Sequence, residues 1–104
     1  MTLEKIKELV ALAVSLDDLD DPRQMDNFSD NVYKPIKAAV AANDRTVIDY
    51  IGSRTPDEMW SVFSAVASGA EIGQHKESVK LYVKMCGLCD CKVRDWAKDL
   101  LPQA

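Results

Sequence analysis

The sequence predicts an all-α fold: a compact bundle of five or six short, mostly antiparallel helices, with the helix over residues 56–68 at its centre. Three observations support this class. Nearly every large apolar residue recurs at the three- and four-residue spacing of a helix. Several segments begin with an N-capping residue or a proline. Only four glycines and four prolines occur among 104 residues, which leaves little turn chemistry for a sheet of many strands.

The length and composition of the chain fit one domain with its own core. A chain of 104 residues, 47% hydrophobic and 29% charged, can bury enough surface to fold without a metal or a disulfide. We expect a single helical domain over residues 1–101 and a C-terminal tail over residues 102–104. The absence of a signal segment or a membrane-length apolar run, and the odd number of cysteines, favour a cytoplasmic protein.

The first predicted helix covers residues 3–16 and begins after Thr2, which is a favoured N-cap. Its apolar face repeats at helical spacing and comprises Leu3, Ile6, Leu9, Val10, Ala13 and Val14. The helix ends before residues 17–21, whose four carboxylates oppose the negative C-terminal end of the helix macrodipole.

The pair Asp21-Pro22 starts the second helix, with the aspartate as N-cap and the proline in the first helical position. Its apolar face begins with Met25, Phe28 and Val32. Pro35 lacks a backbone donor and predicts either a kink near residues 31–34 or two helices, 22–32 and 35–42. The break is favoured because a residue before proline prefers extended backbone.

Asn43 is predicted to stop the second helical segment. Asp44 then caps a third helix over residues 45–51, and Gly52 ends it. A strand over residues 46–51 is the alternative, but no convincing partner strand lies nearby.

The segment Thr55-Pro56-Asp57-Glu58 predicts the central helix, since it combines a capping box with an N-terminal proline and acidic residues. The helix is expected to end at Ser68, with Gly69 as its stop. It is apolar around most of its circumference, which is typical of a buried helix. One polar stripe interrupts it, formed by Asp57, Ser61, Ser64 and Ser68.

Two further helices are predicted near the C-terminus. The first covers residues 74–85 and is broken by Gly87. The second is capped by Asp90 and runs to Leu101, with Val93, Trp96, Ala97 and Leu100 on its inner face.

The net charge of −4 is unevenly distributed along the chain. Residues 1–30 carry eight acidic and three basic side chains, a net charge of −5, whereas residues 31–104 carry ten basic and nine acidic ones. Such an asymmetry favours a partner with a basic surface. We therefore expect a small acidic protein–protein interaction or regulatory module. The residues expected to contact its partner are Asp17, Asp18, Asp20, Asp21, Asp26, Asp30 and Trp60.

Small inhibitors carried by phages and plasmids share this combination of size, acidity and missing motifs. An inhibitor of a host system that handles nucleic acid, such as an anti-CRISPR protein, would fit the charge pattern. The sequence contains no phosphate-binding glycine loop, nucleophile elbow or zinc-protease motif, so we expect no enzymatic activity and no cofactor. We expect neither a membrane nor a nucleic acid as partner, and the apolar central helix leaves a homodimer open.

Two alternatives remain. The first is a metal-stabilised or redox domain, because three thiolates and one imidazole suit zinc; its ligands would be His75, Cys86, Cys89 and Cys91. Each cysteine can also be placed without a metal, as an ordinary thiol of the core or of the surface. The second alternative is a nucleic-acid-binding protein that contacts phosphates through Lys76, Lys80 and Lys84. Acidic neighbours reduce the excess charge of that stretch and favour a solvated face.

Overall fold

The computed structural model describes residues 1–100. Within these residues, helices joined by short connections form the fold, and no strand occurs. The all-α class is therefore confirmed. The elements are α1 (Leu3–Ser15), α2 (Pro22–Phe28), a π-helical turn η1 (Ser29–Tyr33), α3 (Lys34–Ala41), α4 (Arg45–Gly52), α5 (Pro56–Gly73), α6 (Lys76–Leu88) and α7 (Asp95–Leu100). The expected helix end at Leu101 and the tail over residues 102–104 lie outside the described residues.

The helix starts follow the predicted caps. Each of four side chains accepts a hydrogen bond of 3.0–3.3 Å from a backbone N–H in the turn that follows it: Thr2, Asp21, Asp44 and Thr55. The capping box at Thr55 differs from the expected form in one bond. The Glu58 carboxylate accepts from the Thr55 hydroxyl at 3.2 Å, whereas in a capping box this side chain accepts from the backbone N–H of the N-cap residue.

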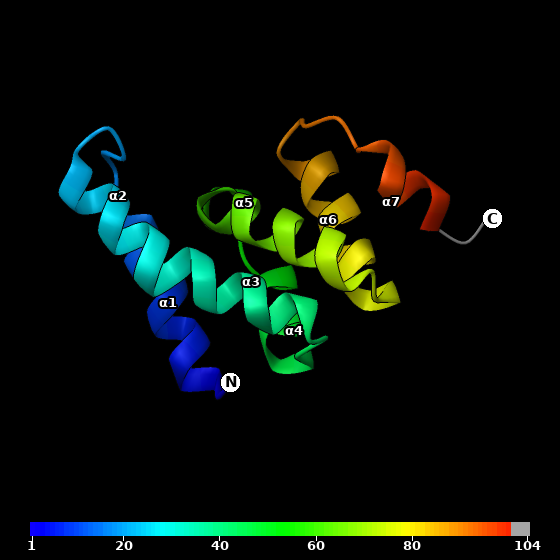
Figure 1. The fold of residues 1–104 in the computed structure, drawn as a ribbon, viewed down its shortest axis with the longest axis horizontal. Helices are drawn as coiled ribbons and strands as arrows, with labels where there is room; N and C mark the ends of the chain where they lie inside the picture. Colours follow the sequence, from blue (N-terminus) through cyan, green and yellow to red (C-terminus); the bar gives the residue numbers. More distant parts are fainter. Residues whose placement is uncertain (101–104) are drawn as a thin grey trace.

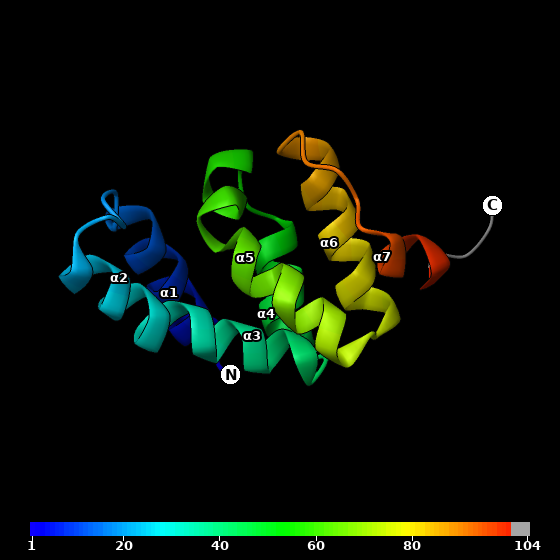
Figure 2. The same cartoon turned by 45° about the horizontal axis from the view of Figure 1, so that its top comes forward.

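Pro35 does not separate two helices, so the expected break is wrong. The segments α2, η1 and α3 form one continuous rod from Pro22 to Ala41, visible in Figures 1 and 2. Lys34 has helical backbone angles (φ −61°, ψ −48°), and its N–H bonds to the carbonyl of Ser29, five residues back. This widened π turn lies directly before the proline, where an α-helix would have no donor and a steric clash.

The central helix α5 is longer than predicted, because Gly69 is not its stop. The helix continues to Gly73. Gln74 follows as its C-cap and has a left-handed φ of 52°. Both glycines lie against α3. A Cβ on Gly69 would lie 2.6 Å from the carbonyl oxygen of Lys37, and one on Gly73 would lie 2.9 Å from the Cα of Ala41. These glycines therefore allow two helices to approach closely.

The C-terminal helices also begin and end at other residues than expected. Gly87 lies inside α6 and does not break it. Asp90 does not cap α7; it has a left-handed φ of 56° and follows the end of α6. There the N–H of Cys91 bonds to the carbonyl of Cys86 at 2.9 Å, a bond that closes helix ends of the Schellman type. α7 starts five residues later, at Asp95.

One hydrophobic core joins the helices, and α5 is at its centre, as predicted. α5 packs against α1, η1, α3 and α6, and Figure 2 shows α5 and α6 side by side and antiparallel. The buried face of the first helix is narrower than predicted, since Leu3 and Val14 are exposed, as are Met25 on α2 and Leu100 on α7. Among residues 1–100, no helix is long and apolar enough to cross a membrane.

Candidate functional site

The connection between α1 and α2 carries a group of carboxylates without cationic partners. We call residues 17–21 the acidic loop. Its backbone is fixed locally, because the Asp18 carboxylate accepts the N–H of Asp20 at 3.2 Å and the Asp18 N–H donates to Gln24 Oε1 at 3.1 Å. None of the six ion pairs within residues 1–100 includes a carboxylate of this loop. The loop therefore presents a concentrated negative charge.

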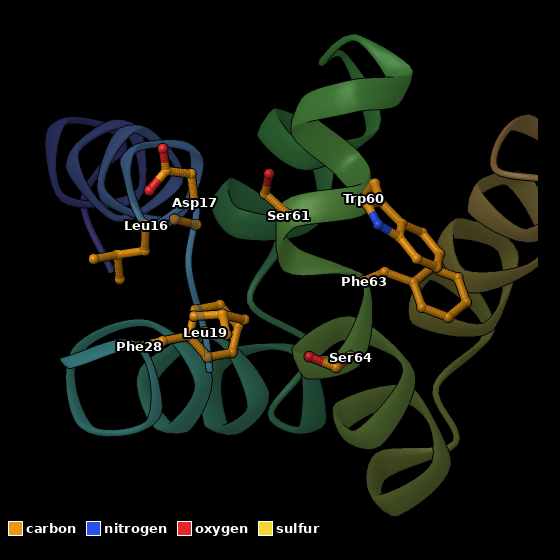
Figure 3. A pocket seen from close by; sticks show the side chains of 9 residues that line it. Leu16, Asp17, Leu19, Phe28, Trp60, Ser61, Phe63 and Ser64 are labelled. Carbon is orange, nitrogen blue, oxygen red and sulfur yellow. The ribbon is translucent and has the colours of Figure 1, made fainter. Parts of the chain in front are cut away.

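A cleft of about 500 Å³ lies between the acidic loop and α5, and Figure 3 shows it from close by. We call it the loop cleft. Apolar side chains form much of its surface, and Asp17 is the only charged residue that lines it. The lining residues are Ala13, Leu16, Asp17, Leu19, Phe28, Trp60, Ser61, Phe63 and Ser64.

The two walls of the loop cleft differ in chemistry. Leu16, Leu19 and Phe28 lie on the side of α1 and α2, opposite α5 (Figure 3). On α5, the side chains of Ser61 and Ser64 lie toward the cleft, while the rings of Trp60 and Phe63 extend toward α6. One wall therefore offers apolar contact, and the other offers hydroxyls that can donate or accept hydrogen bonds.

Trp60 is the exposed end of a row of aromatic side chains. Its ring centroid lies 5.4 Å from that of Phe63, which lies 5.9 Å from Tyr82 on α6. Tyr82 in turn stacks on Trp96 of α7 at 5.0 Å, and its hydroxyl accepts the N–H of Arg94. Tyr82 is buried, whereas 57% of Trp60 is exposed. Trp60 is thus connected to the row through Phe63, and more than half of it remains exposed.

A second, smaller hollow lies on the other side of Trp60. It measures about 380 Å³ and is formed by Pro56, Asp57 and Trp60 at the start of α5 and by Leu88 and Cys89 at the end of α6. We call it the Trp60 hollow. Leu88 is 49% exposed, so two large apolar side chains face solvent here. Trp60 lines both depressions and forms the ridge between them.

The structure brings some of the predicted contact residues together and leaves others apart. Asp17 and Trp60 line the same cleft, and Asp18, Asp20 and Asp21 follow Asp17 in the acidic loop. By contrast, Asp26 on α2 and Asp30 on η1 do not line the cleft, and Asp30 pairs with Lys34 at 2.9 Å.

Sequence reasoning missed the apolar and hydroxyl lining of the cleft. One local signal was available for Leu19, since a leucine within a run of aspartates has no solvation role in an exposed loop. The polar stripe on the central helix was a second signal, because two of its serines, Ser61 and Ser64, face the cleft. Ser68 of the same stripe does form a hydrogen bond to η1: its hydroxyl oxygen lies 2.7 Å from the hydroxyl oxygen of Tyr33.

The structure does not bring the four candidate metal ligands together. His75 is exposed and precedes α6, whereas Cys86 lies near the other end of the same helix. Eleven residues at helical rise separate them by about 16 Å. Burial raises the pKa of Cys86 and of Cys89, which disfavours the thiolate that a metal site or a redox reaction needs. Within residues 1–100, no three His, Cys, Asp or Glu side chains are grouped as ligands.

The lysine stripe on α6 is partly engaged in contacts within the protein. The ammonium of Lys84 donates to the carbonyl of Gly52 at 2.6 Å, at the C-terminal end of α4. Farther along the chain, Arg94 pairs with Glu71 and Lys98 with Asp95. Lys76 and Lys80 are exposed. The basic side chains are thus interspersed with acidic partners over this face.

The loop cleft combines three kinds of contact: apolar side chains, hydroxyls and negative charge at one edge. Such a combination suits the binding of an amphipathic cation more than a neutral or anionic ligand. Comparisons with protein-family models, curated proteins and solved structures find no match to this chain.

Proposed function

We propose that this chain is a protein–protein interaction module, and that its loop cleft binds a partner segment carrying both basic and apolar side chains. The observation that carries the proposal is the cleft of about 500 Å³ with apolar lining and only acidic charge. Clefts of about 300–1,000 Å³ are the usual size of binding sites for a small ligand or an inserted side chain.

The two kinds of lining contribute differently to binding. Leu19 is 38% exposed, and covering it with a partner side chain removes apolar surface from water. Full burial of an exposed leucine contributes about 1.5–3 kcal/mol, so covering the 38% of Leu19 that is exposed contributes about 0.6–1.1 kcal/mol. The carboxylates of the acidic loop add long-range attraction, which mainly raises the association rate and weakens with salt. The apolar lining therefore supplies affinity, and the loop favours basic partners over acidic ones.

Proteins that handle nucleic acid are a natural source of such a partner, because their phosphate-binding surfaces concentrate lysine and arginine. An acidic module seated on that surface would compete with the nucleic acid for the same cations. We therefore propose inhibition of a nucleic-acid-handling system as the form of regulation. The three free thiols fit a protein of the reducing cytoplasm.

The test begins with affinity capture from the source cell and identification of the captured proteins by mass spectrometry. A captured candidate is then purified, and its binding to the chain is measured by calorimetry at several salt concentrations. The triple variant Asp17→Asn, Asp18→Asn, Asp20→Asn removes three of the four charges of the acidic loop. It retains Asp21, which caps α2. We expect weaker binding and a shallower salt dependence.

A matched control removes the same number of charges elsewhere: Glu4→Gln, Glu8→Gln and Asp99→Asn, all exposed. This variant should bind nearly as well as the wild type. A further variant, Ser64→Phe, places a ring in the loop cleft and should block binding without altering net charge. Equal affinity of the wild type, the loop triple variant and Ser64→Phe would rule out the loop cleft as the binding site.

A further inference from the structure

The Trp60 hollow has the features of a site for one cationic side chain. We propose that it binds an arginine of the partner protein, on the opposite side of the Trp60 ridge from the loop cleft. This inference rests on the proposed function and adds a second contact to it. The partner would then straddle Trp60, with an apolar and basic segment in the loop cleft and an arginine in the hollow.

The apolar part of the hollow suits the stem and the flat face of a guanidinium group. Phe63 lies against Trp60 at a centroid distance of 5.4 Å, yet 57% of Trp60 remains exposed. Tryptophan is the best side chain for stacking with a cation, and arginine is the commonest cation in such pairs. Leu88 is also exposed and lies across the hollow, where it can contact the aliphatic stem.

The charge around the hollow is negative. Asp57 is the only charged residue that lines it, and no ion pair within residues 1–100 includes Asp57. Glu58, in the same turn, is instead bound to the Thr55 hydroxyl. The hollow also lies at the C-terminal end of α6, which has no basic residue in its last turn. The negative C-terminal end of the α6 macrodipole favours a cation there, and the Asp57 carboxylate offsets the positive N-terminal end of α5.

The raised pKa of the Cys89 thiol is consistent with the negative charge of Asp57 beside it. Burial is the main cause that raises its pKa, and the neighbouring thiols and the charge of Asp57 add to the effect. Arginine satisfies all of these features together, because its planar guanidinium can stack on the indole while donating hydrogen bonds to a carboxylate. A lysine ammonium would meet the charge but not the flat surface. The position of Trp60 as a ridge between two depressions also matches the central aromatic anchor typical of protein interfaces.

The first experiment uses the full chain, labelled with ¹⁵N, and a blocked arginine (N-acetyl-arginine methylamide) as probe. Blocked citrulline, which has nearly the same shape without the charge, is the matched control. We expect the arginine probe to shift the Trp60 indole resonance and the backbone amides of Asp57, Leu88 and Cys89 in a saturable way. Citrulline should bind about tenfold more weakly, as expected for loss of one charge-assisted hydrogen bond.

Two variants test the two halves of the site. Asp57→Asn should lower the affinity for the arginine probe about tenfold, and Trp60→Leu should abolish the saturable shifts. Glu8→Gln removes an exposed carboxylate of α1 that lines neither depression, and it should leave the affinity for the arginine probe and the saturable shifts unchanged. The same spectra report whether each variant is folded. Equal shifts with arginine and citrulline, or the same affinity in Asp57→Asn as in the wild type, would overturn the proposal.

Two further outcomes separate this inference from others. If the same resonances shift with protein concentration alone, a second copy of the chain occupies the hollow and the arginine proposal is wrong. With a purified partner, Asp57→Asn should weaken binding independently of the loop triple variant. A loss of binding in the loop variant but not in Asp57→Asn would refute the arginine site and leave the proposed function standing. No loss in Asp57→Asn, in the loop triple variant or in Ser64→Phe would refute both.

Discussion

Replacing Gly69 by alanine should destabilise this protein, although the same change inside most helices is stabilising. Gly69 lies where α5 crosses α3. An added Cβ would lie 2.6 Å from the carbonyl oxygen of Lys37 and 2.8 Å from the Cβ of Val40. The carbonyl oxygen is a backbone atom of α3, and the Cβ of Val40 is bonded directly to that backbone. Neither atom can therefore move away by a change of side-chain rotamer. The two helices must therefore separate along their contact.

The expected magnitude follows from two opposing effects. Overpacking of a core costs about 1–3 kcal/mol, and a clash with backbone belongs in the upper part of that range. The higher helix propensity of alanine offsets about 1 kcal/mol of it. Gly69→Ala should thus lower the free energy of unfolding by about 1–2 kcal/mol, which corresponds to a fall in Tm of about 5–10 °C in a chain of this size.

Gly87 provides the matched control, because it lies inside α6 and a Cβ there would meet no atom within 4 Å. Gly87→Ala should therefore raise the free energy of unfolding by about 0.5–1 kcal/mol. Urea denaturation followed by circular dichroism measures both variants. Opposite signs are expected. If Gly69→Ala were as stable as the wild type, or if both substitutions were stabilising, the close approach of α3 and α5 would be wrong.

Three further results are expected. Gln74→Gly should raise the free energy of unfolding by about 1 kcal/mol, because a residue with a Cβ is strained at the left-handed φ of 52°; a loss of stability in urea denaturation would contradict this. The α-ammonium group of Met1, which bonds to Asp44 at 2.7 Å, holds the pKa of that carboxyl below its usual range. The negative charge of Asp44 therefore stabilises the fold at neutral pH, and this contribution disappears as the pH falls through the lowered pKa of Asp44. Asp44→Asn, which can still cap α4, should cost about 1 kcal/mol at neutral pH and nothing near pH 2; an equal cost at both pH values in urea denaturation would count against the ion pair. Finally, Cys86 is buried and its pKa is raised, so at most two of the three thiols should react promptly with an aromatic disulfide reagent at neutral pH, the last one reacting only on unfolding.

The sequence was sufficient to predict where most helices begin, because an N-cap depends on a few adjacent residues. Thr2, Asp21, Asp44 and Thr55 each need only their own side chain and the next backbone N–H groups. The stop at Asn43 is local in the same way. It has a φ of 60°, and the N–H groups of Asn43 and Asp44 close the end of α3.

Glycine and proline were harder to interpret, because their effect here depends on what lies opposite them. Gly69 and Gly87 have the same propensity, but one faces the backbone of α3 and the other faces solvent. Neither ends a helix. Pro35 was expected to break the rod, and the π turn before it removes the conflict with the preceding carbonyls. A single sequence does not show which partner surface a glycine meets, or whether a helix will widen by one residue.

The candidate site was predicted in part for a related reason. Charge patterns are visible in a sequence, so the acidic loop was predicted as a contact surface. Trp60 was predicted as a contact residue of the central helix. The cleft itself is formed by residues far apart in the chain, such as Leu16 and Ser64. Only the packing of α1 and α2 beside α5 reveals that they share one surface. Asp26 and Asp30 were included because they continue the acidic stretch; neither lines the loop cleft, and Asp30 pairs with Lys34.

The row from Trp60 to Trp96 shows how one set of aromatic contacts can serve both stability and binding. Tyr82 and its neighbours link α5, α6 and α7, and the loss of a buried aromatic side chain costs about 3–5 kcal/mol. Trp60 contacts the same row through Phe63 alone, and more than half of it is exposed, so it adds little to the fold. Trp60 and Leu88 line the same hollow and are both exposed, and contiguous exposed apolar surface is typical of interaction sites. The contact with Phe63 ties Trp60 to this row, and binding of the proposed partner would cover the part of its ring that is exposed.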